Sequence, residues 1–289
     1  MAIENISDTA RWVAVYRAME TERPDAIFRD PFARRLAGAK GEEIVQALAR
    51  GHQMAWAMIV RTASFDELIL GRVRAGADTV VNLAAGLDAR PWRLDLPPSL
   101  RWIDVDLPGI LGHKPEMLKD ERPRCHYEAV HADLTDAAVR SSLFARIGSE
   151  GKNTLVVTEG LLIYLTPDQV SALARDLHAQ SSFRWWLFDL VSPMLLVRMN
   201  RMWGKTLASG NAPFRFAPAE GTAFFTPLGW RELEFRSNFT EAHRLKREMP
   251  MMWFWRFVMR FSPPERVEAM RRFAGAVLLE RADELVSRW

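Results

Sequence analysis

The stretch that decides the fold is Thr79-Val-Val-Asn-Leu-Ala-Ala-Gly-Leu-Asp88. Its first five residues form a short, mostly apolar run with β-branched side chains, which predicts a buried strand. Small residues follow at 84–86, where a chain can turn tightly and let a ligand approach its backbone. A strand that ends in such a turn is typical of a parallel α/β sheet with a ligand site at its edge.

Similar runs lie on both sides of this stretch, separated by helix-like segments. The other expected strands are 101–105, 127–132, 154–158, 185–191, 230–236 and 276–280. The expected helices between them include 108–119, 136–147 and 167–180. This alternation predicts an α/β fold, a doubly wound, mostly parallel seven-stranded sheet with helices on both faces. We expect the last two strands to close one edge as an antiparallel pair.

One domain, 1–289, accommodates this order of elements. Its expected parts are a helical N-terminal cap at 1–75, a ligand-binding core at 76–191, and lid insertions with the closing strands at 192–289. Within the cap, helices are expected to start at Ser7 or Asp8 and at Asp30-Pro31, and a helical pattern continues over 42–58.

The composition is that of a folded globular protein, with 48% apolar and 26% charged residues. A single cysteine, Cys125, excludes an internal disulfide framework and suits a reducing compartment, so we expect a cytoplasmic protein. No secretory signal is visible at the N-terminus. The most apolar segment, 249–261, is shorter than the roughly 20 apolar residues that span a bilayer, and no membrane span is expected.

Acidic residues follow the predicted strands at the edge where ligands bind in open α/β sheets. Asp106 follows the second strand, where such folds hold a ribose, Asp133 follows the third, and Glu159 follows the fourth. Any one of these acids could simply cap a helix. Together with the turn at 84–86, they predict a ligand site.

The motifs that bind pyrophosphate are absent from the sequence. The turn at 84–86 is not G-x-G-x-x-G, and no G-x-x-x-x-G-K-[ST] occurs. A cofactor without phosphate is therefore favoured over a nicotinamide dinucleotide or a nucleoside triphosphate. S-adenosylmethionine fits, because it offers a ribose, an adenine and a charged amino acid tail to successive strand ends.

The sequence resembles the leucine carboxyl methyltransferase family, and in particular its bacterial O-methyltransferase branch linked to polyketide and other secondary metabolism. The motifs that carry the resemblance are Arg61-Thr62 with Phe65-Asp66, Val80-Val-Asn-Leu-Ala-Ala-Gly-Leu-Asp-Ala-Arg-Pro-Trp-Arg-Leu94, Asp104-Val-Asp-Leu-Pro108, Ala132-Asp-Leu134 and Val157-Thr-Glu-Gly-Leu-Leu-Ile-Tyr-Leu165. The resemblance implies a Rossmann-like class I methyltransferase that converts S-adenosylmethionine to S-adenosylhomocysteine without a metal.

The resemblance also implies which residues bind the cofactor. Arg61 would bind its carboxylate, the turn from Ala84 to Gly86 would pass under its methionine part, and Glu159 would close the site. The ribose and adenine would be held by Asp106 with Leu107, and by Asp133 and Leu134. The family has glycine where this chain has Ala84, and a positive φ at Ala84 would lower the affinity for the cofactor.

Methyl transfer from a sulfonium is an in-line displacement that depends on alignment and exclusion of water. A carboxylate acceptor needs no base, whereas a hydroxyl acceptor benefits from one. Tyr164 is the candidate catalytic residue, with packing against the following helix as its alternative role. We expect O-methylation of a small, largely apolar metabolite, and a protein C-terminal carboxylate or binding without turnover remain alternatives.

Tryptophan, methionine and positive charge concentrate late in the chain. Seven of 11 Trp and eight of 13 Met lie at or after residue 185, and the residues from 191 onward hold 16 basic and 10 acidic side chains. Segments 194–203 and 249–261 are expected to form a lid over the acceptor. They could instead be ordinary buried helices, or a surface for a second copy, an acidic carrier protein or a membrane interface. No nucleic-acid partner is expected.

Overall fold

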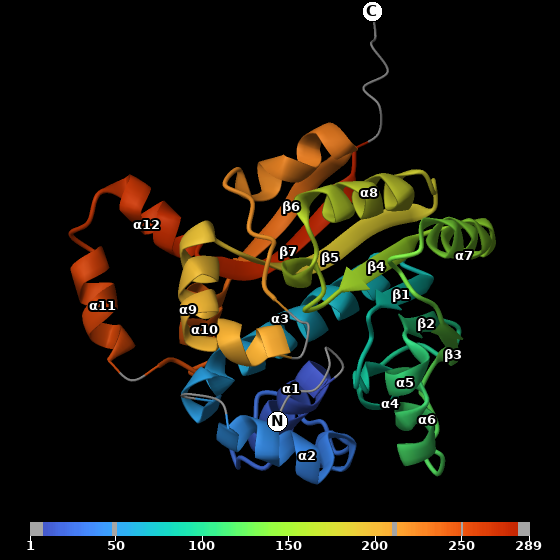
Figure 1. Ribbon diagram of the computed structural model, residues 1–289, viewed down its shortest axis with the longest axis horizontal. Helices are drawn as coiled ribbons and strands as arrows, with labels where there is room; N and C mark the ends of the chain where they lie inside the picture. The colour runs from blue at the N-terminus through green and yellow to red at the C-terminus, as the bar shows by residue number, and fades with distance from the viewer. Residues whose placement is uncertain (1–7, 48–50, 210–212, 250, 283–289) are drawn as a thin grey trace, which may run out of the picture.

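The computed structural model describes residues 8–47, 51–209, 213–249 and 251–282, and is organised around one seven-stranded sheet (Figure 1). The strand order is β3-β2-β1-β4-β5-β7-β6. All neighbouring strands run parallel except the two pairs that β7 makes. The strands are β1 (Thr79–Leu83), β2 (Arg101–Asp106), β3 (His126–His131), β4 (Thr154–Thr158), β5 (Phe183–Val191), β6 (Trp230–Ser237) and β7 (Ala274–Arg281). The predicted fold class is confirmed.

The helices precede the sheet, connect its strands, and fill two late insertions (Figure 1). The N-terminal ones are α1 (Asp8–Thr21), α2 (Ala33–Ala47) and α3 (Gly51–Arg74). Those between the parallel strands are α4 (Arg90–Arg93), α5 (Pro108–Leu111), α6 (His113–Met117), α7 (Ala137–Glu150), the 3₁₀ helix η1 (Leu162–Tyr164) and α8 (Pro167–His178). The late ones are α9 (Pro193–Ser209), the 3₁₀ helix η2 (Gly221–Leu228), α10 (Asn238–Arg244), α11 (Met252–Met259) and α12 (Pro264–Arg271).

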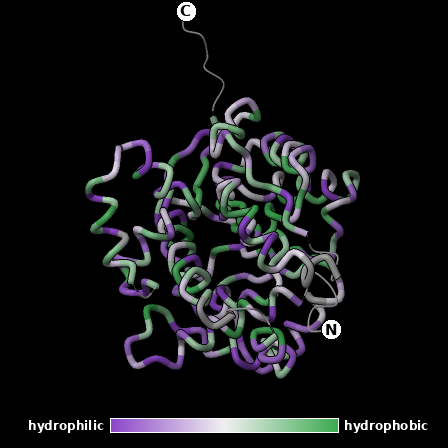
Figure 2. The backbone as a smooth tube through the Cα atoms, turned by 60° about the vertical axis from the view of Figure 1, so that its left-hand side comes forward, coloured by the Kyte–Doolittle hydropathy of each residue, from purple (hydrophilic) through white to green (hydrophobic). Residues whose placement is uncertain are grey.

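Alternating side chains of the strands build a core on each face of the sheet. In β1, Val80 packs in the cluster that includes Phe65 and Ile69 of α3. Its neighbour Val81 packs in the cluster that includes Phe144 of α7 and Leu173 of α8. Both faces of the central strands are therefore buried from solvent, and apolar residues gather in the middle of the molecule (Figure 2). Polar side chains of these strands can reach a ligand only at the strand ends.

Three predicted helix boundaries differ from the structure. The expected helix 108–119 is two short helices, because Gly112 ends the first and Pro115 cannot continue an unbroken hydrogen-bond ladder. The helix expected at Asp30-Pro31 begins at Ala33, after a turn that the Asp30 carboxylate stabilises through the amide of Phe32. The pattern at 42–58 belongs to two helices, α2 and α3, and the alternative start at Ser7 lies outside the described residues.

The sheet edge formed by β6 is fastened to α8 by Trp230. Its side chain is 1% exposed, packs against Trp186, and donates a hydrogen bond of 3.0 Å from Nε1 to the carbonyl oxygen of Ala174. No helix in the described part of the chain is long and apolar enough to cross a membrane.

We expect Trp230→Ala to lower the free energy of unfolding by about 3–5 kcal/mol, because it opens a cavity between β6 and α8. Trp230→Phe keeps an aromatic ring there and should lose about 1–2 kcal/mol with the hydrogen bond. Equilibrium unfolding in urea measures both. Trp253→Ala, at a side chain that is 66% exposed, is the control and should change stability by less than about 0.5 kcal/mol. Equal losses in the two alanine variants would contradict this role for Trp230.

Candidate functional site

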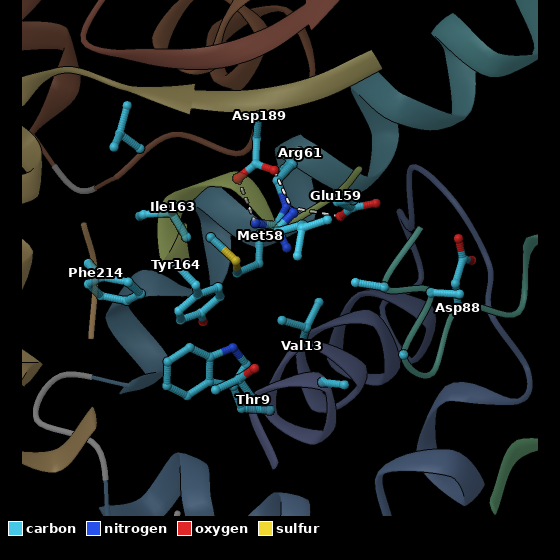
Figure 3. Close-up of a pocket in the computed structure, with 18 of the residues that line it drawn as sticks. Thr9, Val13, Met58, Arg61, Asp88, Glu159, Ile163, Tyr164, Asp189 and Phe214 are labelled. Atoms are coloured by element: carbon cyan, nitrogen blue, oxygen red, sulfur yellow. Dashed lines mark hydrogen bonds and ion pairs between the residues drawn. The ribbon is translucent and has the colours of Figure 1, made fainter. Parts of the chain in front are cut away.

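A pocket of about 500 Å³ opens at the carboxyl ends of the parallel strands, with walls from α1, α3 and α9 (Figure 3). Its volume lies in the range of small-molecule and cofactor sites. All of the predicted site residues line it, namely Arg61, Ala84, Gly86, Asp106, Leu107, Asp133, Leu134, Glu159 and Tyr164. Residues 100 positions apart in the sequence therefore meet in one cavity.

The turn after β1 positions the Asp106 carboxylate. Gly86 has φ +52° and donates its amide hydrogen to Asp106 Oδ2 at 2.7 Å, while the amide of Leu107 donates to Oδ1 at 2.7 Å. Burial raises the pKa of Asp106 in spite of these two bonds. A Cβ at Gly86 would lie 3.0 Å from the Cβ of Ala10 on α1, so a glycine here lets the covering helix approach.

Ala84 adopts the left-handed conformation, with φ +55°. This is the position where the sequence departs from the glycine of the resembling family. A side chain in this conformation costs about 1–2 kcal/mol relative to the right-handed region. The structure therefore places backbone strain at the turn that borders the pocket.

A network of largely buried ion pairs forms part of the pocket wall, and Arg61 on α3 is one of its members (Figure 3). Arg61 donates from Nε to Glu159 Oε1 at 2.9 Å and from Nη1 to Asp189 Oδ2 at 3.2 Å. The other oxygen of Asp189 accepts the amide of Gly160 at 2.6 Å. Burial opposes the charge of Arg61, but Asp189 and Glu159 outweigh it and raise its pKa. Arg61 is therefore a fixed cation on the pocket wall.

Arg90 shares Glu159 with Arg61 and extends the network to two further acids. Its guanidinium contacts Asp66 at 2.6 Å, Asp88 at 2.7 Å and Glu159 at 2.8 Å. Burial would raise the pKa of Asp88, but Arg90 and its other basic neighbours lower it to about 2. The pKa of Glu159 is also lowered, because Arg90 and Arg61 outweigh its burial. The arginines of the network thus favour the ionised forms of Asp88 and Glu159.

The network continues into the N-terminal segment. Arg93 bonds both oxygens of Asp66 at 2.7 Å, and Arg17 of α1 contacts Asp30 at 2.8 Å and the carbonyl oxygen of Leu87 at 2.6 Å. Four arginines and five carboxylates make up the network, which gives it a formal charge of −1; they are Arg17, Arg61, Arg90, Arg93, Asp30, Asp66, Asp88, Glu159 and Asp189.

The third strand end is more open than the others. Asp133 is exposed, and its Oδ1 accepts the amide and the hydroxyl of Thr135 at 2.8 and 2.7 Å, which lowers its pKa. Leu107 is 39% exposed, and Leu134 is half-buried. These side chains border the mouth of the pocket, where a flat apolar group could lie between them.

The opposite end of the pocket is aromatic. Trp12 of α1 packs against Trp203 of α9 with ring centroids 6.3 Å apart, and Tyr164 packs against Phe214 at 5.4 Å. Burial raises the pKa of Tyr164 to about 12, so its phenol is neutral at ordinary pH and can donate a hydrogen bond. Tyr164 lines the pocket and packs against Phe214, whereas the alternative role was packing against the following helix. Its catalytic role stays a prediction.

Several lining residues were not predicted from the sequence, among them Trp12, Val13, Asp88, Asp189 and Phe214. Asp189 lies two residues before the end of the fifth predicted strand, so a search for acids that included the last residues of each strand would have found it. The α1 residues carry no signal beyond helical periodicity.

The lid prediction holds for one of its two segments. Leu195, Met199 and Trp203 of α9 line the pocket. No described residue of 249–261 lines it, so that part of the prediction is wrong. Five apolar side chains of this segment are exposed to solvent, namely Met251, Trp253, Phe254, Phe257 and Phe261.

Comparisons with known proteins point in one direction. The family model described as leucine carboxyl methyltransferase matches residues 10–178. A Streptomyces coelicolor protein named "Putative S-adenosyl-L-methionine-dependent methyltransferase" is 35% identical over 183 residues, which are 60% of this chain and 65% of that protein. A Parafrankia protein whose name also begins with these words is 36% identical over 181 residues, 59% of this chain and 58% of the relative. The match thus spans less than two thirds of these relatives.

Two solved structures share the fold. A "putative methyltransferase" from Thermobifida fusca has a TM-score of 0.60 at 12% identity and covers 98% of this chain and 97% of its own. A DUF574 family protein from Streptomyces avermitilis has a TM-score of 0.57 at 13% identity, covering 93% of this chain and 96% of its own. At these identities the likeness shows the fold alone.

We expect Ala84→Gly to leave the free energy of unfolding unchanged or to raise it by up to about 1 kcal/mol. The variant relieves the left-handed strain, which is partly offset by the greater freedom of glycine in the unfolded chain. Ala85→Gly, next door and without a positive φ, is the matched control and should lose about 0.5–1 kcal/mol. Urea unfolding distinguishes them, and equal losses would show that Ala84 is unstrained.

Acid should weaken the fold through Asp88. Its folded pKa of about 2 lies below its ordinary value of 3.8, so ionised Asp88 stabilises the fold above pH 4, by about 2 kcal/mol, and this contribution is lost as the pH falls to 2. Asp88→Asn should flatten the dependence of the free energy of unfolding on pH across that window. Parallel curves for the two proteins, measured in urea at each pH, would contradict the assignment.

Proposed function

This chain belongs to the leucine carboxyl methyltransferase family, and from that premise we propose that it is an S-adenosylmethionine-dependent methyltransferase. The family match and the names of the relatives confirm the cofactor prediction at the level of the family. The observation that carries the proposal is the pocket itself, in which the ion network and the turn after β1 meet.

The described residues fit this cofactor. At neutral pH S-adenosylmethionine carries one net positive charge, from a sulfonium, an ammonium and a carboxylate. The whole network of four arginines and five carboxylates carries one net negative formal charge, so the cofactor and the network are complementary. Arg61 would bind the carboxylate through Nη2, which has no hydrogen bond to a described residue. Glu159 and Asp88 would face the cationic groups, and Asp106 the ribose.

Bound S-adenosylmethionine supplies an activated methyl group, so the protein needs no covalent nucleophile. The work of this chain is to orient the two reactants and to exclude water. Trp12 of α1 and Trp203 of α9 pack over the pocket and keep solvent from its aromatic end. The neutral phenol of Tyr164 would position the acceptor by hydrogen bonding.

We propose that the acceptor is a carboxylate of an apolar metabolite, a class that includes polyketide-like acids. The described pocket lining contains no His, Lys or Cys, and Glu159 and Asp189 are both engaged by Arg61. The pKa of Tyr164, raised to about 12, makes it a poor base. A carboxylate is already ionised at neutral pH and needs no base, whereas a hydroxyl would.

Two variants test the cofactor site. Arg61→Gln and Asp106→Asn should each weaken the binding of S-adenosylmethionine by about tenfold or more, since each removes a charge-assisted contact of about 1.5–3 kcal/mol. Isothermal titration calorimetry measures the change. Arg101→Gln breaks an ion pair with Glu150 that is 2.7 Å long and outside the pocket, and should bind like the wild type. Undiminished binding by both site variants would overturn the proposal.

The acceptor class has its own test. We expect labelled methyl groups transferred to cell-extract acids to be released as methanol in mild alkali, as esters are and aryl ethers are not. The rate constant at saturation should be flat between about pH 7 and 9, and Tyr164→Phe should retain it within about tenfold. A rate that rises with pH, or a loss of about 10²-fold or more in Tyr164→Phe, would favour a hydroxyl acceptor. A C-terminal peptide assayed in parallel tests the protein acceptor.

A further inference from the structure

The arm formed by residues 251–272, which holds α11 and α12, has no buried side chain among its described residues. It occupies the left edge of the molecule in Figure 1, and its last residue, Arg272, pairs with Glu232 of β6 at 2.7 Å. Helices of globular proteins are usually held by an apolar face turned toward the core. The exposed apolar side chains of the arm therefore need a different explanation.

The outward face of α11 is aromatic. Trp253 is 66% exposed, Phe257 is 60% exposed, and Phe261 just beyond the helix is 74% exposed. At about 100° per residue, Trp253, Phe254 and Phe257 lie within one arc of about 100° around the helix axis. Their rings contact each other, with centroids 6.0 Å apart for Trp253 and Phe254 and 5.3 Å for Phe257 and Phe261. The arm presents a continuous aromatic strip to solvent.

Positive charge borders this strip. Arg256 and Arg260, four residues apart, lie on the face next to the arc of Trp253 and Phe257, and both are exposed. The sequence from 249 to 272 contains five arginines and two glutamates, a net charge of +3. Aromatic side chains on one face with arginines beside them are the pattern of a helix that lies in a membrane interface.

A lipid surface suits this face better than a protein does. Two copies of the arm would bring like charges together, which opposes pairing. The aromatic strip is a projecting helix and not a groove, and the pocket described above does not extend to it. Eight residues of α11 are too few to span a bilayer, so the helix could only lie flat.

Helix α9 carries a second exposed patch of the same chemistry. Met194 is 74% exposed and Val197 is 51% exposed, and Arg198 and Arg201 continue the same face at helical spacing. The opposite face of α9 contributes Met199 and Trp203 to the pocket wall. A surface that binds the outer face of α9 would therefore contact the same helix whose inner face lines the pocket.

We propose that the arm, together with the outer face of α9, docks the protein on an anionic lipid surface. The rings of Trp253, Phe254 and Phe257 enter the interface, and the arginines contact lipid phosphates. The inference goes beyond the proposed function, since docking requires neither the cofactor nor methyl transfer.

Flotation of the full chain with vesicles tests the docking. We expect binding to vesicles that contain phosphatidylglycerol, weaker binding to phosphatidylcholine alone, and loss of binding at high salt. The paired variant Trp253→Ser with Phe257→Ser should bind at least about tenfold more weakly. Val139→Ser with Leu233→Ser, at apolar side chains that are each 41% exposed outside the arm, is the matched control and should bind like the wild type.

Titration with S-adenosylmethionine separates this test from the proposed function, because the arm variant should bind the cofactor normally whether or not vesicles are bound. Absence of wild-type binding to anionic vesicles, or equal binding by the arm variant, would overturn docking. Light scattering gives the mass in solution. A dimer that the arm variant converts to a monomer, with no vesicle binding, would assign the face to a second copy and overturn the lipid proposal.

Discussion

The guanidinium of Arg90 is the contact on which the rest of the site depends. It is 2% exposed and holds Asp66 of α3, Asp88 after β1 and Glu159 after β4 at once. Removing one partner from such a buried pair typically costs about 3–5 kcal/mol, because the remaining charge stays desolvated. Three segments that are distant in sequence are therefore locked in one geometry, and that geometry places the strand ends around the pocket.

The same network explains why the N-terminal segment is part of the site. Arg17 of α1 reaches Asp30 and the carbonyl oxygen of Leu87, so the first helix is held against the turn that follows β1. A Cβ at Gly86 would lie only 3.0 Å from the Cβ of Ala10, so glycine at this position favours the close approach of α1. Helix α1 thereby covers the cavity and adds Trp12 to its wall. The cap thereby encloses the pocket, as the proposed methyl transfer would require.

The sequence predicted what is encoded locally and missed what depends on tertiary contacts. Strand-end residues such as Asp106 and Glu159 follow short apolar runs, so their place at the sheet edge could be read from spacing. Trp12 lies in an ordinary helical pattern, and nothing local says that α1 folds back over the sheet. The prediction that 249–261 belongs to the lid rests on its apolar periodicity. Such periodicity marks one face of a helix, but it does not say whether protein, ligand or another surface covers that face.

The two ends of the pocket are built by different means, and under the proposed function this would separate cofactor binding from acceptor choice. The end at Asp106 and Arg61 is made of strand termini, a strained turn and interlocked charges, where a change in one residue disturbs several others. The aromatic end is made of side chains such as Trp203 and Phe214, which come from late insertions and contact one another. Substitutions there can reshape the cavity without breaking the ion network. Under the proposed function, acceptor specificity would therefore be set by residues that can change without disturbing the cofactor end, and the family match ends at residue 178, before these insertions begin.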